Sequence, residues 1–175
     1  MRTKKMRSVL KWTSYVLFAL VLFCFQIAPT KIALFAQVAY LLPFLIAFAC
    51  REEIIPSVLF ATICGLFIDY SMQRQFGYNA IILSILCVAV WVCMRFFVRP
   101  IFVSIIISVA ASALIYCLLD FFFFFVITDI DSASSVFFNV HLPVFLKTSI
   151  FGAGIAYVTD KIYNLSPIRA RFDID

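Results

Sequence analysis

The sequence predicts an all-α fold, a polytopic integral membrane bundle of six transmembrane helices. Of the 175 residues, 65% are hydrophobic and only 13% are charged, whereas soluble domains average about 45–50% apolar and about 25% charged residues. A globule of this size cannot hide so much apolar surface from water. This composition disfavours a soluble enzyme, a nucleic-acid-binding domain and a disordered regulator. Six spans of about 20 residues each leave no room for a separate soluble domain, so residues 1–175 are expected to form one transmembrane domain.

Six apolar runs separated by short polar segments define the predicted helices. They cover residues 12–28, 32–50, 54–70, 78–97, 101–128 and 144–158. The first run resembles a signal peptide, but no convincing small-x-small cleavage site follows it, so we expect a retained helix. Pro43 lies inside the second run and predicts a kink. Pro56 lies in the first turn of the third run, where proline is tolerated.

The later part of the chain is less regular. The run 101–128 is longer than a bilayer core of about 30 Å requires, which predicts tilt or a break. Asp129–Pro143 is mildly polar and predicts an interfacial helix or loop, with His141 as an interfacial polar residue. Asp120 and Lys147 lie within apolar runs. They are expected to pair with each other or to extend toward the interface, with a transport role as the further alternative.

The distribution of basic residues predicts the orientation of the helices. Eleven Lys and Arg residues fall in the N-terminal segment, the turns near residues 51 and 95–99, and the C-terminal tail, whereas only Lys31 and Arg74 fall in the opposite loops. Cytoplasmic loops carry an excess of Lys and Arg. We therefore expect a multi-pass protein of the cell membrane with both termini in the cytoplasm and the loop near Arg74 outside.

Motifs for catalysis and for metal or cofactor binding are absent from the sequence. The six cysteines form no C-x-x-C pair and lie at no metal-ligand spacing with the single histidine. There is no G-x-S-x-G, no H-E-x-x-H and no phosphate-binding glycine loop. We expect a non-enzymatic protein with no metal and no cofactor, and no nucleic-acid partner.

One stripe of residues in the third predicted helix is a candidate site. Ser57, Ala61, Gly65 and Asp69 are spaced by four and share a helical face. The small residues allow a neighbouring backbone to approach closely. Asp69 has three interpretations: a cap or salt-bridge acceptor for Arg74 or for the N–H groups that open the next helix, a partner-binding group, or an ion- or proton-handling group.

The start of the fourth predicted helix completes this candidate. In Gly77-Tyr78-Asn79-Ala80, the glycine permits a positive φ where the chain turns back, and Asn79 can cap the helix that follows. Residues 65–80 are therefore interpreted as a tight hairpin. The candidate structural or partner-binding residues are Gly65, Asp69, Gly77, Asn79, Ala80, Ser57 and Ala61.

Small residues also recur in two later helices. Ser104, Ser108 and Ser112 are spaced by four in the fifth run, and Gly152 and Ala156 are spaced by four in the sixth. We expect both sets to be seams between helices of the same chain, with binding faces as the alternative.

The hairpin pattern resembles that of a known family. Gly65-Leu66-Phe67-Ile68-Asp69, followed after seven residues by Gly77-Tyr78-Asn79-Ala80, is similar to the G-x-x-x-D…G-x-N-A signature of the rod shape-determining protein MreD family. The end of the first helix, Phe25-Gln26-Ile27, resembles the aromatic or apolar residue and Gln often found there. The family often has a Ser-Gly-rich or proline-bearing loop, where this chain has Met72-Gln73-Arg74-Gln75-Phe76.

The resemblance implies a non-catalytic scaffold of the cell-elongation machinery, which builds lateral peptidoglycan in rod-shaped bacteria. The implied partners are an MreC-like bitopic membrane protein and, through it, MreB-like actin filaments and a glycan polymerase/transpeptidase pair. The lipid bilayer is the remaining partner, and basic tails suit anionic lipids.

An alternative function is the substrate-binding membrane subunit of an energy-coupling-factor-type vitamin transporter, also a six-helix protein of about this size. Such a subunit needs a polar pocket on the outer side and an Ala-x-x-x-Ala-type coupling face on the first helix. The first helix here has Ala19 and Ala28, which are not so spaced, and the loop after it has only about three residues. These features favour the scaffold.

Overall fold

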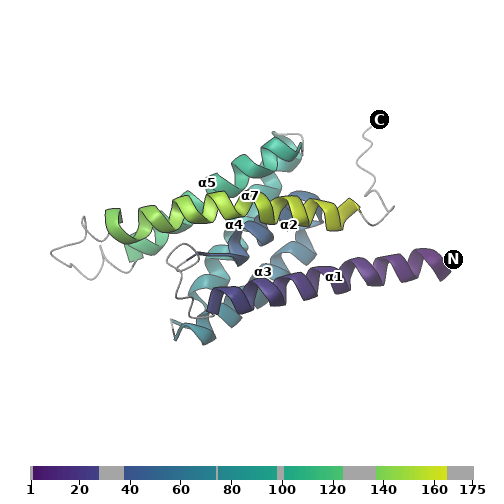
Figure 1. Cartoon of the computed structure of the whole chain (residues 1–175), viewed down its shortest axis with the longest axis horizontal. Coiled ribbons are helices and arrows are strands. Elements are labelled where there is room, and N and C mark those ends of the chain that lie inside the picture. The colour runs from purple at the N-terminus through teal and green to yellow at the C-terminus, as the bar shows by residue number, and fades with distance from the viewer. Residues whose placement is uncertain (1, 28–37, 74, 98–100, 124–136, 165–175) are drawn as a thin grey trace.

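The protein is a bundle of helices packed around a short central one (Figure 1). The computed structural model describes residues 2–27, 38–73, 75–97, 101–123 and 137–164, with side chains from residue 9 onward. Its elements are α1 (Arg2–Ile27), α2 (Leu41–Arg51), α3 (Ile54–Ser71), α4 (Tyr78–Phe96), α5 (Phe102–Phe121), the π-helical turn η2 (Phe137–His141) and α7 (Leu142–Asn164). The described residues contain no strand, which confirms the predicted all-α class.

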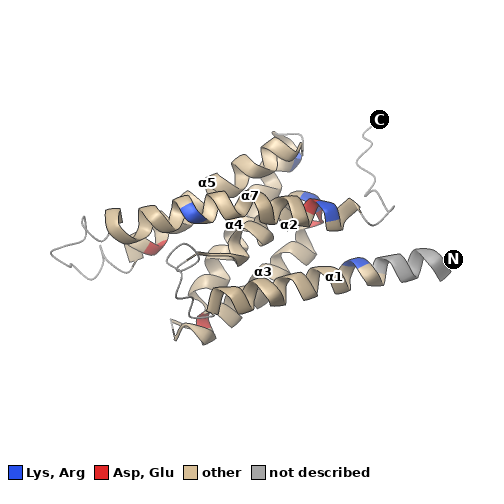
Figure 2. Cartoon of the chain, in the orientation of Figure 1, with Lys and Arg blue, Asp and Glu red and all other residues tan. Residues whose placement is uncertain are grey.

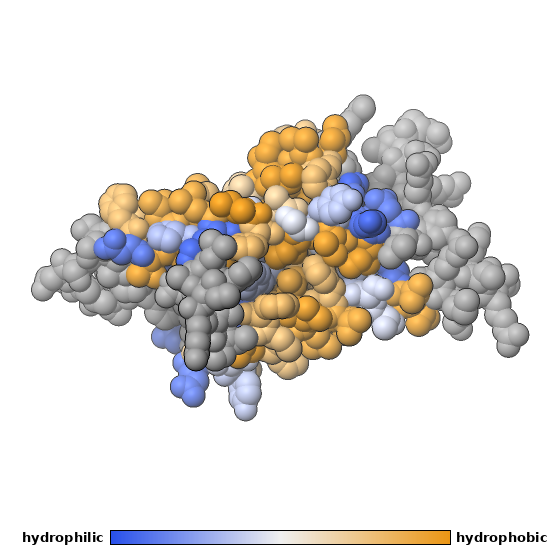
Figure 3. Space-filling model, in the orientation of Figure 1, coloured by the Kyte–Doolittle hydropathy of each residue, from blue (hydrophilic) through white to orange (hydrophobic). Residues whose placement is uncertain are grey.

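The lengths and hydropathy of the helices match a bilayer. In the described residues, five segments are long and apolar enough to span a membrane: Val9–Ile27 of α1, then α3, α4, α5 and the unit Phe137–Asn164. Figure 3 shows hydrophobic surface across the middle of the molecule, between hydrophilic patches toward its two sides. The chain is thus a multi-pass membrane protein.

Helix α2 is shorter than the others and lies at the centre of the core. Each of its residues from Leu41 to Cys50 is buried, and α1, α3, α4, α5 and α7 all pack against it. With 11 residues against 18 in α3, α2 is about 10 Å shorter at 1.5 Å per residue. The hydrophobic core is one cluster to which all six α-helices contribute.

The predicted start of this second helix at residue 32 is wrong within the described residues. Val38–Tyr40 are not helical, and α2 begins at Leu41; residues 28–37 lie outside the described residues. Pro43 therefore falls in the first turn of α2, where its missing N–H has no partner to lose, and the predicted kink is not required. In place of helical bonds, Leu41 N–H donates to Gln26 Oε1 (3.0 Å) and Ala39 N–H to Thr148 Oγ1 (3.2 Å).

Other predicted boundaries also shift. Helix α1 begins at Arg2, well before residue 12, and α5 ends at Phe121, with residues 124–128 outside the described part. Helix α7 runs to Asn164, beyond residue 158. Hydropathy alone does not predict the polar ends of α1 and α7, because a helix can continue past the apolar core of the membrane into the interface.

His141, predicted from its sequence context to be an interfacial polar residue, packs against aromatic rings; its position relative to the membrane interface stays a prediction. His141 is buried at the end of η2, which leads directly into α7. Its ring stacks on Phe137 (centroids 6.4 Å apart) and meets the edge of Phe121 (5.6 Å). Aromatic packing explains the burial, since imidazole offers a flat face to phenyl rings. Residues 129–136 of the predicted interfacial segment lie outside the described residues.

Ion pairs join three helices at one end of the bundle. Lys11 of α1 pairs with Glu52, just after α2, and Arg51 pairs with Asp160 of α7 (2.6 Å). The Tyr163 ring lies 4.9 Å from Lys11 Nζ and 5.6 Å from the Arg51 guanidinium. Figure 2 shows basic and acidic positions together where α7 nears its C-terminal end. The N-terminal part of α1, the α2–α3 turn and the end of α7 therefore share one side, as the charge distribution predicts.

The predicted seam at Gly152 is confirmed. A β-carbon there would lie 2.8 Å from Val109 Cγ1 of α5 and 3.2 Å from Pro43 Cβ of α2, so the glycine lets three helices meet. Ser112 of α5 is buried as well. Asp120 is buried and Lys147 is partly buried; their pairing stays a prediction.

Candidate functional site

The hairpin formed by α3 and α4 contains the candidate residues, and its close packing begins at Gly65. A β-carbon at this position would lie 2.5 Å from the Ala80 nitrogen and 2.8 Å from the Asn79 carbonyl carbon. Real β-carbons do not approach backbone atoms this closely, so only glycine allows α3 to pack against the backbone at the start of α4. The predicted close-approach role of Gly65 is confirmed, and Ala80 is its partner.

Asp69 caps the N-terminus of α4 from the neighbouring helix. Its Oδ2 accepts the Gly77 N–H (2.9 Å), and its Oδ1 accepts the Asn79 N–H (3.1 Å) and one hydrogen of the Asn79 side-chain amide (2.7 Å). The first N–H groups of a helix lack intrahelical partners and carry the positive end of the helix dipole. These donors compensate a carboxylate that is only 1% exposed. Of the three interpretations, this geometry matches the cap for the next helix; Arg74 lies outside the described residues.

Asn79 extends this contact to a third helix. Its side chain is fully buried, and its Oδ1 accepts the hydroxyl of Tyr116 on α5 (2.6 Å). The prediction that Asn79 caps its own helix is wrong, because Asn79 lies in the first turn of α4 and its side chain binds Asp69 and Tyr116 instead. The relay Asp69–Asn79–Tyr116 links α3, α4 and α5 by hydrogen bonds in a buried setting, where such bonds are strong.

Gly77 sets the geometry of the turn into α4. Its φ is +94° and it occupies the N-cap position of the helix, as the sequence predicts. The Gly77 carbonyl accepts the Ile81 N–H (3.0 Å), and the Tyr78 N–H donates to the Gln75 carbonyl (3.2 Å). Gln73 also has a positive φ of 51°. The turn is thus closed by its own backbone and by Asp69.

The remaining stripe residues are buried on the same face of α3. Ser57 and Ala61 are buried with Gly65 and Asp69, and the Ser57 hydroxyl donates to the Glu53 carbonyl (2.8 Å). One residue after Ala61, the hydroxyl of Thr62 on α3 forms a hydrogen bond with the hydroxyl of Ser84 on α4 (2.8 Å). Within this chain the stripe is therefore buried, and its Gly65 and Asp69 end packs the hairpin.

Several contributing residues are not among the sequence-based candidates. Tyr116 follows Ser112 by one turn on α5 and is polar within an apolar run, a signal that the seam pattern could have included. Gln26 and Thr148 hold the start of α2, and no local pattern reveals such a contact between residues that are distant in sequence. The ion pairs of Lys11 and Arg51 depend in the same way on helix packing.

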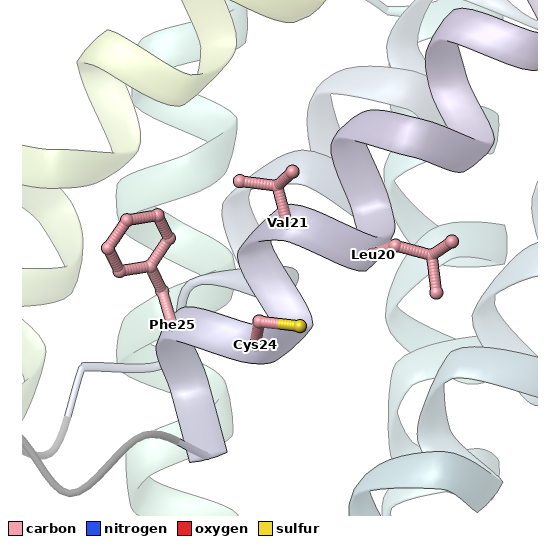
Figure 4. Close-up of a pocket in the computed structure, with 4 residues that line it drawn as sticks. All are labelled: Leu20, Val21, Cys24 and Phe25. Carbon is pink, nitrogen blue, oxygen red and sulfur yellow. The ribbon is translucent and has the colours of Figure 1, made fainter.

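A concave feature lies on the outer surface of α1. It has a volume of about 330 Å³ and is lined by Leu20, Val21, Cys24 and Phe25 (Figure 4). All of these side chains are apolar, so this pocket offers no polar groups to orient a small polar ligand. Among the described residues, no group of three or more His, Cys, Asp or Glu side chains is placed to hold a metal ion.

Comparison with protein-family models finds no matching family, and comparison with curated proteins and with solved structures finds no similar protein.

Proposed function

We propose that this protein is a non-catalytic, MreD-like scaffold of the cell-elongation machinery, with both termini in the cytoplasm. It would hold an MreC-like bitopic membrane protein and, through it, MreB-like filaments and the glycan polymerase/transpeptidase pair. Its action would be to present fixed helix surfaces to other membrane helices. The proposal rests on the resemblance of the hairpin sequence, together with the geometry of the same residues.

A single observation supports it most. The residues that carry the resemblance, Gly65, Asp69, Gly77, Asn79 and Ala80, meet in one interlocked unit at the start of α4. A chance scatter of small and polar residues would not be expected to interlock in this way. The pattern therefore favours a rigid hairpin, and a scaffold requires rigid surfaces.

The hydrogen bonds that Asp69 accepts favour a scaffolding role over ion or proton coupling. Its oxygens are already engaged by the Gly77 N–H, the Asn79 N–H and the Asn79 amide. A transported cation would have to displace these donors and leave them unsatisfied, which costs free energy at each turnover. A structural carboxylate has no such requirement.

The test is capture of partners from native membranes. The full-length chain, tagged at one terminus, is expressed at its natural level, extracted in a mild detergent and recovered, and the associated proteins are identified by mass spectrometry. We expect a single-span MreC-like protein and the wall-synthesis pair to be enriched. Recovery of a transporter ATPase and its coupling subunit instead would contradict the proposal and favour the vitamin-transporter alternative.

A matched pair of glycine variants gives this test its control. Gly65→Leu places a side chain into the backbone of α4, whereas the position of Gly154 on α7 faces open space. Partner recovery should be lost with Gly65→Leu and kept with Gly154→Leu. Cells that depend on the chain should become round with the first variant and stay rod-shaped with the second.

A further inference from the structure

Helix α1 has the least buried span in the part of the chain that the structure describes. Only 17% of its spanning segment is buried, against 28–39% in the other four spans. It contains one alanine and no glycine, and the residues that it buries include the large side chains of Tyr15 and Leu22. Helices in a membrane associate through close packing and hydrogen bonds, because lipid chains can replace ordinary apolar contacts. Helix α1 therefore lacks the close seam that Gly152 gives to α7.

Polar contacts hold α1 at its two ends, and each of them reaches an end of α2. At the charged end of α1, Glu52, the residue after α2, pairs with Lys11 and accepts the Tyr15 hydroxyl (3.1 Å). At the opposite end, Gln26 accepts the N–H of Leu41, the first residue of α2 (3.0 Å). Helix α1 thus lies as a strap that is attached at both ends of the central helix.

The two attachments differ in their chemistry. Gln26 forms a hydrogen bond between uncharged groups, whereas Lys11 and Glu52 form an ion pair whose side chains are each 11% exposed. If Glu52 loses its charge, Lys11 becomes a largely buried cation without its partner, which is costly. The long Lys11 side chain can then extend into water at the membrane boundary. A change of charge therefore loosens the charged end of α1 and leaves the Gln26 end attached.

Aromatic rings of α2 lie beneath the charged end of α1. Trp12 and Tyr15 pack on Phe48, with centroid distances of 6.1 and 4.8 Å, and Tyr15 also lies 6.3 Å from Phe44. Phe44 and Phe48 are fully buried. If the charged end of α1 moves away from α2, these two rings become accessible from within the membrane.

From these contacts we propose that α1 is a strap helix that opens at its charged end when the Lys11–Glu52 pair is broken. It then pivots at Gln26 and uncovers Phe44 and Phe48 of the central helix. Such a device couples the charge at one membrane boundary to the surface that the chain presents inside the membrane. The inference goes beyond the proposed function and does not depend on it, because it rests only on contacts within this chain.

The test measures distances between pairs of spin labels on the full-length chain in lipid nanodiscs. The two exposed native cysteines are first replaced by serine. One pair of labels, at Leu10 and Lys161, reports on the charged end, and the other, at Ile27 and Ile150, reports on the Gln26 end; all four positions are exposed. With Glu52→Gln, we expect a second, longer distance in at least half of the molecules for the first pair. The second pair should keep its original distance.

Glu53→Gln is the matched control, because Glu53 is the neighbouring carboxylate, is exposed and loses the same charge. Both pairs of labels should keep their original distances in this variant. The reversed ion pair, Lys11→Glu with Glu52→Lys, should restore the short distance at the charged end. A fold that is merely damaged by the loss of Glu52 would not be repaired by this exchange.

A second measurement leaves the ion pair unaltered and so does not depend on the folding of a variant in it. Salt screens charge pairs that water can reach, so raising it to molar concentration should increase the long-distance population of the labelled chain several-fold. If neither Glu52→Gln nor salt separates the charged end, the packing of Trp12 and Tyr15 is sufficient to hold α1, and the proposal is overturned. Separation at both ends would overturn the pivot at Gln26.

Discussion

Replacement of Asp69 gives the most direct test of the hairpin. Asp69→Leu removes the acceptor of the Gly77 N–H, the Asn79 N–H and the Asn79 side-chain amide. Each buried donor left unsatisfied costs about 1–3 kcal/mol, so three of them predict a loss of about 3–6 kcal/mol in the free energy of unfolding, allowing for partial rescue by water. That is a large share of the stability of a typical domain, about 5–15 kcal/mol.

Asp69→Asn should be much milder, because the relay can reverse its direction. The carbonyl oxygen of the new amide can still accept the two backbone N–H groups, and its NH₂ can donate to Asn79 Oδ1 if the Asn79 amide rotates by half a turn. Tyr116, which now donates to that oxygen, can accept instead, since a phenol does both. The loss is then limited to charge assistance, about 1–2 kcal/mol.

The measurement is unfolding of the purified variants in mixed micelles of a mild detergent and SDS, together with their abundance in membranes and their partner recovery. We expect the order wild type, Asn, Leu for all three quantities. An Asn variant that is abundant and stable yet recovers no partner would refute the cap as the whole role of Asp69. It would mean that the negative charge itself is used for recognition or for transport.

Four further predictions follow, three from the structure and one from the charge distribution. Gly65→Ala should destabilise the protein by about 2 kcal/mol through overpacking against α4, whereas Gly154→Ala, in open space, should be neutral or stabilising; equal melting temperatures for the two variants would contradict the close approach. Tyr116→Phe should cost about 1–2 kcal/mol in SDS unfolding by leaving Asn79 Oδ1 without a donor, and this cost should shrink when Asn79 is already replaced by Ala. A double-mutant cycle of Lys11→Met with Glu52→Gln should give a coupling energy of about 1 kcal/mol. If the double variant loses only the sum of what the two single variants lose, the ion pair contributes nothing. In a cysteine-free background, a cysteine at position 74 should react with an impermeant reagent from outside and cysteines at positions 5 and 171 should not; the reverse pattern would overturn the orientation.

The sequence predicts the third and fourth helices almost to the residue, and it predicts the second poorly. Ile54–Ser71 and Tyr78–Phe96 are bounded by polar residues and by a glycine with positive φ, which are local signals. The start of α2 depends instead on Gln26 and Thr148, which lie 15 and 109 residues away from their backbone partners. A hydropathy run cannot indicate that a backbone donor finds its acceptor on another helix.

The candidate site shows the same division. The positive φ of Gly77 and the packing of Gly65 follow from the properties of glycine and were predictable at each position. The role of Asn79 was not predictable from the sequence. An Asn in the first turn can cap its own helix or bind another helix, and the choice here depends on Tyr116 from α5. The burial of His141 was not predictable for a related reason, since it depends on Phe121 and Phe137 and not on the polarity of the histidine itself.

The α3–α4 hairpin and the outer surface of α1 differ in how they can be perturbed. The hairpin is buried, and its polar groups are bonded to one another, so most changes at Gly65, Asp69 or Asn79 alter folding and partner binding together. The outer surface of α1 around Cys24 is exposed, so changes there alter a surface that the fold does not depend on. If the chain is a scaffold, loss of partners through a change on an exposed surface without loss of stability is therefore the cleaner demonstration of that role. Loss of partners through Asp69 shows only that the hairpin must be intact.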